Sequence, residues 1–194
     1  MFAKEQQRED VQQLRREWLE YITHIDANRL VFLDETGINI AMTRLYGRAP
    51  KGERIIEYVP DVRYKRLSVV STLRVTGDTV PFVYSGTMNG NLFMQYIALC
   101  VVPTLKPYDI LVMDCLSSHK MKIISEMVEA VGANVVYLPP YSPDFNPVEL
   151  LWAEIKADLR KLKARSVVDL CDALNFAFFS IQTEHVKCYF KKCF

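Results

Sequence analysis

The sequence lacks the features that would place it in a membrane, an oxidising compartment or a strongly charged class. No apolar run reaches the ~20 residues that a membrane-spanning helix needs. The five cysteines are odd in number and form no Cys-x-x-Cys pair, which favours reduced thiols. The 24 Lys and Arg residues nearly balance the 23 Asp and Glu residues, so the net charge of +1 creates no overall attraction to polyanions. We therefore expect a soluble, cytoplasmic protein with no membrane partner.

What the sequence does contain is enough apolar material for one domain with a sizeable core. Half of the 194 residues are apolar. Apolar runs and periodicity predict strands over 29–40, 66–75, 79–86, 109–114 and 134–140. They predict helices over 4–22, 91–105 (ended by Pro103), 119–132, 147–162 and 167–190. Gly77 and Asp78 predict a hairpin turn between the second and third strands. Three strands followed by alternating helices and strands predict an α/β fold, with one mixed sheet flanked by helices.

Two acidic side chains stand where apolar residues are expected. Asp34 interrupts the first strand, and Asp114 ends the fourth. Each alone would be explained by a strand end that turns to solvent, because a buried, unneutralised acid is costly. Together with Glu149, at the head of a helix, they would be tolerable around hard divalent cations. Paired ions of this kind clamp both sides of an in-line phosphoryl displacement.

The entry to the helix at 147–162 is unusually stiff, with four prolines among nine residues. Asn146, Pro147 and Glu149 fit a capping box, in which Glu149 only stabilises the helix. Alternatively, the stiff loop positions Glu149 for chemistry with little entropy left to lose. Glu149 lies off the apolar stripe and heads a row of cations, Lys156, Arg160 and Lys163. The expected stripe comprises Val148, Leu151, Trp152, Ile155, Leu159 and Leu162.

Three segments carry a resemblance to a known family. "VFLDETGI", "LVMDCLSSHK" and "YLPPYSPDFNPVELLWAEIK" resemble the acidic blocks of DDE transposases of the mariner-like superfamily, in its bacterial insertion-sequence branch. Thirty-four residues separate Asp114 from Glu149, as in that superfamily. The resemblance implies an RNase H-like DDE catalytic domain over residues 28–194. We expect residues 1–27 to form an N-terminal helix or linker, with the family's helix-turn-helix DNA-binding region absent.

The resemblance also implies an activity and a set of partners. Asp34, Asp114 and Glu149 would be the catalytic residues and would hold two Mg²⁺ ions, with Mn²⁺ as a substitute, for DNA strand cleavage and transfer in transposition. The expected partners are double-stranded DNA of the transposon ends and target, a separately encoded helix-turn-helix fragment and a second copy of the chain. The expected location is the bacterial cytoplasm, in association with the nucleoid. The candidate contacts to the DNA backbone are Arg44, Arg48, Lys51, Arg54, His119, Lys120, Lys156 and Arg160; the alternative for the basic loop and the helix flank is simple solvation.

Two departures from the family pattern keep a second interpretation open. Cys115 follows the second acid, where the family usually has Asn. One charged helix precedes the first strand, where full-length members carry helix-turn-helix domains. These departures favour a non-catalytic transposase remnant that binds DNA or a partner, whereas the presence of all three acids favours the nuclease. A two-carboxylate glycosidase is a third interpretation, weakened because nothing resembles a sugar-binding platform.

Overall fold

The computed structural model describes residues 4–44, 46–56, 58, 66–115 and 122–194. Within these ranges one five-stranded sheet has the order β3-β2-β1-β4-β5. The strands are β1 (Leu30–Ile38), β2 (Leu67–Arg74), β3 (Phe82–Ser85), β4 (Ile110–Met113) and β5 (Asn134–Tyr137). β1 pairs with β2 antiparallel and with β4 parallel. The mixed sheet expected from the order of elements is therefore confirmed.

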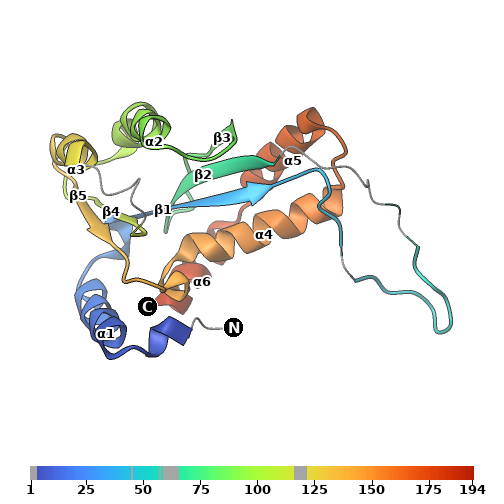
Figure 1. Cartoon of the computed structure of the whole chain (residues 1–194), viewed down its shortest axis with the longest axis horizontal. Helices are drawn as coiled ribbons and strands as arrows, with labels where there is room; N and C mark the ends of the chain where they lie inside the picture. Colours follow the sequence, from blue (N-terminus) through green and yellow to red (C-terminus); the bar gives the residue numbers. More distant parts are fainter. Residues whose placement is uncertain (1–3, 45, 57, 59–65, 116–121) are drawn as a thin grey trace.

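Helices cover both faces of the sheet (Figure 1). They are α1 (Glu9–Thr23), α2 (Gly90–Tyr96), α3 (Lys122–Glu129), α4 (Pro147–Leu162), α5 (Val167–Phe179) and α6 (Thr183–Cys193). Alternate residues of β1 face opposite sides, as a strand requires. Leu30 and Phe32 pack in one core with side chains of α1, α4, α5 and α6. Val31 and Leu33 pack in a second core with α2 and α3.

The expected hairpin between β2 and β3 is confirmed. The Arg74 N–H donates to the Asp78 carbonyl at 3.0 Å, and the Gly77 N–H donates to the Arg74 carbonyl at 2.9 Å. Gly77 has a φ of 94°, which a residue without Cβ adopts readily. An isolated bridge joins Leu73 to Thr79. Regular pairing of β3 begins only at Phe82, three residues later than the predicted strand.

The helix predicted over 91–105 is only partly α-helical. α2 is followed by a π-helical turn (Ile97–Val101) and a 3-10 turn (Val102–Thr104). Pro103 has no backbone N–H, and its ring clashes with the carbonyl four residues before it. A regular α-helix cannot continue through such a residue, so a wider and then a tighter turn carry the chain past it.

Two expectations for the C-terminal helices were wrong. The single helix predicted over 167–190 is two helices, because α5 ends at Phe179 and α6 begins at Thr183. The intervening segment has no Gly or Pro, so no stop signal was visible in the sequence. Leu162, expected on the buried stripe of α4, is 45% exposed. Lys163 adopts a left-handed conformation and ends the helix at that point.

α1 is packed into the body through one side. Val11, Trp18 and Ile22 are buried, whereas Leu14 on the same helix is 44% exposed.

No helix of the described ranges is long and apolar enough to cross a membrane. All five cysteines are free.

Candidate active site

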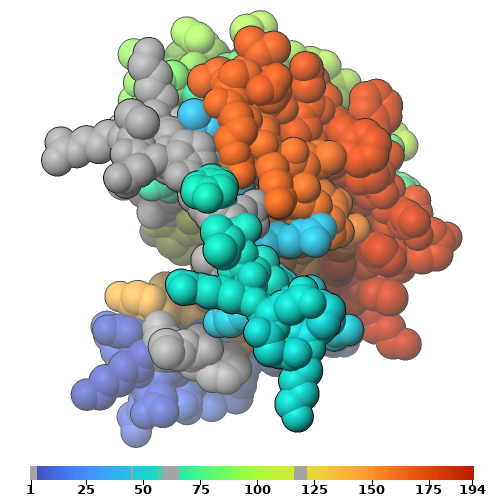
Figure 2. Space-filling view, turned by 90° about the vertical axis from the view of Figure 1, so that its right-hand side faces the viewer, coloured from blue at the N-terminus to red at the C-terminus, as the bar shows by residue number. Residues whose placement is uncertain are grey.

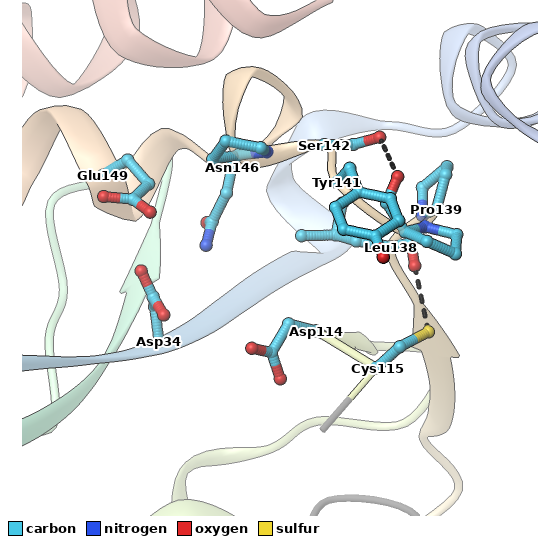
Figure 3. A pocket seen from close by; sticks show the side chains of 11 residues that line it. Asp34, Asp114, Cys115, Leu138, Pro139, Tyr141, Ser142, Asn146 and Glu149 are labelled. Atoms are coloured by element: carbon cyan, nitrogen blue, oxygen red, sulfur yellow. Dashed lines mark hydrogen bonds between the residues drawn. The ribbon is translucent and has the colours of Figure 1, made fainter. Parts of the chain in front are cut away.

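Three carboxylates from three separate elements line one cavity of about 440 Å³ (Figure 3). Asp34 comes from the middle of β1, Asp114 directly follows β4, and Glu149 lies in the first turn of α4. β1 and β4 are adjacent parallel strands, so both point toward the same end of the sheet. α4 packs across β1 in the shared core. The fold thus brings together the three acids that the sequence pattern singled out.

The proline-rich loop forms the opposite wall of this cavity, with Leu138, Pro139, Pro140, Tyr141, Ser142 and Pro143. α1 holds the loop from behind. The guanidinium of Arg15 donates to both carboxylate oxygens of Asp144, at 3.0 and 2.6 Å, and to Ser142 Oγ at 2.7 Å. The same guanidinium lies 4.0 Å from the centre of the Phe145 ring. The entry to α4 is therefore fixed by a second element as well as by its prolines.

Glu149 takes no part in capping α4. The Asn146 side chain accepts from the Val148 N–H at 3.2 Å, so Asn146 is the N-cap, as expected. The Asn146 N–H, which a capping box would give to Glu149, donates instead to the Pro143 carbonyl at 3.1 Å. A true capping box occurs in α5, where Ser166 and Asp169 bond each other's backbone. α4 thus has no capping box at Glu149, and the Glu149 carboxylate faces Asp34 across the cavity (Figure 3).

The carboxylates of this cavity repel one another. Burial first, and then the charges of Glu149 and Asp114, raise the pKa of Asp34 to about 7, although the Glu35 N–H, 2.8 Å away, opposes the shift. Burial also raises the pKa of Glu149; the nearby Lys156 opposes this change, and Asp114 adds to it. Such acids favour either a proton or a cation in their midst.

The donor set fits a hard divalent cation. Carboxylate oxygens are the ligands that Mg²⁺ and Mn²⁺ prefer, and a bound cation would relieve the repulsion that raises the pKa of Asp34. Across the described ranges, no group of three or more His, Cys, Asp or Glu side chains stands ready to hold an ion. Binding would therefore have to draw the carboxylates closer together.

Cys115 does not face the carboxylates. Its thiol donates to the Leu138 carbonyl at 3.2 Å, which ties the end of β4 to the start of the proline-rich loop. In Figure 3 the sulfur points away from the Asp114 carboxylate. The residue in the position of the usual Asn thus has a structural contact.

The predicted DNA-binding residues fall into three groups. Lys156 and Arg160 line a second cavity, of about 400 Å³, beside α4. Arg44, Arg48, Lys51 and Arg54 are exposed, on a segment that projects from the body as an arm (Figures 1 and 2). His119 and Lys120 lie outside the described residues. Arg15, which anchors the loop, was not singled out from the sequence, because a basic residue on a charged helix carries no local signal.

Comparison with known proteins gives a family and a fold. A family model described as DDE superfamily endonuclease matches residues 29–171. The catalytic domain of Mos1 mariner transposase is similar to the chain, with a TM-score of 0.70 and 16% identity over 100% of this chain and 91% of that one. A pre-cleavage Mos1 transpososome gives a TM-score of 0.77 and 16% identity over 100% of this chain and 61% of that one. The chain thus spans about three fifths of that transposase.

A Mos1 paired-end complex with Mg gives a TM-score of 0.76 and 18% identity, over 98% of this chain and 60% of that one. No curated protein matches the chain. At these identities the solved structures show the fold alone, and they confirm the expected RNase H-like arrangement of a mixed sheet flanked by helices.

Proposed function

The chain belongs to the DDE superfamily endonucleases, and we propose that it is the catalytic part of a mariner-like transposase of the bacterial insertion-sequence branch. It cleaves DNA strands and joins them to a target in a metal-dependent reaction. The observation that carries this proposal is the single cavity lined by Asp34, Asp114 and Glu149. Mos1 transposase, which shares the fold, has been solved in complexes with Mg and with Mn.

Each acid has a distinct part in this proposal. Two Mg²⁺ ions, or Mn²⁺ in their place, would polarise the scissile phosphate and activate the attacking hydroxyl when bound. Asp34 and Asp114, at the adjacent parallel strands, and Glu149, held by the loop and α4, provide the oxygen ligands. The Asp34 carboxyl, whose pKa is raised, would release its proton to solvent on binding a cation.

The proposed partners follow from charge and from the family. DNA of the transposon ends and the target lies along the cationic flank of α4, at Lys156 and Arg160, and along the exposed arm, at Arg48 and its basic neighbours. His119 and Lys120 remain proposed DNA contacts. A separately encoded helix-turn-helix fragment and a second copy of the chain are the proposed protein partners, in a bacterial cytoplasm.

A non-catalytic remnant is the second candidate function. It is favoured because the carboxylates do not form a ready cluster of three ligands within the described ranges. In that case the chain would bind DNA or a transposase subunit without cleaving it. The two functions differ in whether divalent cations bind to the cavity.

A nuclease assay with matched variants tests the proposal. Supercoiled plasmid or end-containing duplex is incubated with the chain and Mg²⁺ or Mn²⁺. Asp34→Asn and Asp114→Asn should each lower strand cleavage by about 10²–10³, as loss of one well-placed electrostatic element does. Asp158→Asn, an acid on α4 that pairs with Lys161 outside the cavity, should cleave like the parent. Cleavage that persists in both cavity variants would show that it does not depend on this cavity, and no cation binding at millimolar concentration would leave the remnant as the function.

A further inference from the structure

β1 and α4 run side by side in the same direction (Figure 1), and they line two cavities in succession. Asp34 and Glu149 line the acidic cavity. Gly37 and Lys156, further along the strand and the helix, line the second. Three strand residues rise about 10 Å and seven helix residues about 10.5 Å. The pair formed by Gly37 and Lys156 therefore lies directly after the acidic pair.

The side chain of Lys156 is directed back toward the acids. The Cα–Cβ bonds of a helix tilt toward its N-terminus, and long side chains cover the preceding turn. Lys156 is half-buried and lies two turns after Glu149 on the same face of α4, so a side chain that leans toward the helix N-terminus runs from the second cavity toward the acidic one. Arg160, one turn further on, lines the same second cavity as Lys156 and lies farther from the acids.

The electrostatic coupling agrees with this placement. Burial lowers the pKa of Lys156. The charges of Glu149 and Asp34 raise this pKa, and those of Arg160 and Arg66 lower it. In return, Lys156 is the main group that lowers the pKa of Glu149 against the effect of burial. One ammonium thus acts on two of the three acids of the neighbouring cavity.

We propose that Lys156 is a positioning residue of the acidic cavity, whose ammonium neutralises Glu149 and Asp34 while no metal is bound and opposes the entry of a divalent cation. This inference rests on the proposed metal-binding role of the acids. It gives Lys156 a function in the absence of DNA, separate from any contact with a phosphate. The lysine lets two repelling carboxylates line one cavity, and it raises the cation concentration needed to occupy the site.

Metal titration of the full chain without DNA tests this role. Mn²⁺ binding is measured by calorimetry for the parent, Lys156→Gln and Lys156→Arg. Lys156→Gln should bind Mn²⁺ about threefold to tenfold more tightly, because it removes a competing charge whose partly exposed ion pairs are of modest strength. Lys156→Arg retains the charge and should bind like the parent.

Two further variants on the same helix separate a local counterion from a general positive field. Lys161→Gln removes an exposed cation that pairs with Asp158 at 2.6 Å, and it should leave Mn²⁺ affinity unchanged. Arg160→Gln removes the cation one turn beyond Lys156 and should have a severalfold smaller effect than Lys156→Gln. In a Glu149→Gln background, the gain from Lys156→Gln should shrink, because the two residues act on each other.

The outcomes separate this inference from the proposed nuclease. If the parent binds Mn²⁺ and Lys156→Gln binds no more tightly, the counterion role is overturned and the nuclease stands. Equal effects of Lys156→Gln and Arg160→Gln would also overturn it, in favour of a diffuse field. If neither the parent nor Lys156→Gln binds Mn²⁺, both the counterion role and the metal-dependent nuclease fail.

Discussion

Asn146 and Glu149 divide two tasks at the start of α4. The Asn146 side chain caps the helix, and its N–H is taken by the Pro143 carbonyl. Glu149 is thereby left to face the acidic cavity. A residue that looks like half of a capping box in the sequence is separated from that role by a single backbone hydrogen bond, which no local pattern encodes.

Glu149→Gln should separate metal binding from helix stability. Without metal, the variant should be as stable as the parent or slightly more so, because one like-charge repulsion disappears. Loss of negative charge at the helix N-terminus offsets this by ~0.3–1 kcal/mol. The rise in melting temperature on adding Mg²⁺ should shrink, since binding to the native state is what stabilises it. Thermal melts in EDTA and in Mg²⁺ measure both effects.

Ser166→Ala supplies the matched control for a lost cap. Ser166 belongs to the real capping box of α5, so its replacement should cost about 0.5–2 kcal/mol. Its Mg²⁺-dependent rise in melting temperature should equal that of the parent. If the response of Glu149→Gln to Mg²⁺ is unchanged, like that of Ser166→Ala, Glu149 is a structural residue.

The raised pKa of Asp34 makes the metal-free protein sensitive to pH. Its pKa is about 7 in the folded chain against an ordinary value of 3.8, so the native state binds more protons between these values. Stability should therefore fall as pH rises from about 4 to about 7. Asp34→Asn removes the titrating group, so its melting temperature in EDTA should fall less than that of the parent between pH 5 and pH 7.5.

The same group links pH to metal binding. A proton on Asp34 competes with a cation, so the Mg²⁺-dependent rise in melting temperature should be larger at pH 7.5 than at pH 5. Melts of the parent at the two pH values, with and without Mg²⁺, measure this difference. A rise in melting temperature that is independent of pH would mean that Asp34 is already ionised at pH 5. Its pKa in the folded chain would then lie well below 7.

At the scale of elements, α1 stabilises the proline-rich loop that lines the candidate active site. Burial alone would raise the pKa of Asp144, but the bond from Arg15 holds it below its ordinary value. The pair is partly buried, with Arg15 at 19% and Asp144 at 35% side-chain exposure. The helix that precedes the sheet thus reaches the loop that precedes α4.

Arg15→Ala should loosen this loop. It removes two charge-assisted hydrogen bonds to Asp144, one to Ser142 and the contact with the Phe145 ring, at a cost of about 1.5–3 kcal/mol. Hydrogen exchange at residues 138–146 should accelerate, and chemical denaturation should show the loss of stability. Arg16→Ala is the control, because the side chain of Arg16 bonds only the exposed Gln13 in the described part of the chain. Equal exchange in the two variants would show that the prolines alone fix the loop.

The sequence predicted elements better than it predicted their interruptions. Short apolar runs located β1 and β2, which are buried along most of their length, and a helical apolar stripe located α4. The break between α5 and α6 carries no Gly or Pro, and it depends on packing between segments that are distant in the sequence. Asp34 and Asp114 could be singled out because an acid in or at the end of an apolar strand is costly, and Glu149 because it follows a stiff proline loop. The anchor Arg15 looks like any basic residue on a charged helix.

At the scale of the whole molecule, charge is balanced in number but uneven in position. The arm carries exposed Arg44, Arg48, Lys51 and Arg54, and it projects from the same end of the sheet as the end of β1 (Figure 1). Phosphate contacts position a protein on DNA but carry no sequence information. The chain should therefore bind transposon ends and random duplexes alike, and a clear preference for one sequence would contradict this view of its surface.

Replacing the basic residues of the arm should test whether it lies on DNA or is only solvated. In EDTA, the logarithm of the affinity for a duplex is measured against the logarithm of salt concentration. Each phosphate contact contributes a slope of about 0.9, so a variant with Arg48, Lys51 and Arg54 all changed to Gln should lose up to about 2.7 from the slope. The control changes three other exposed residues to Gln: Arg8, Lys106 and Lys122. Lys122 begins α3, which lies at the opposite end of the molecule from the arm (Figure 1). The control removes the same net charge, so a general loss of positive potential would lower both slopes equally. An arm that contacts the backbone lowers only the first slope, and an unchanged first slope would assign the arm to solvent.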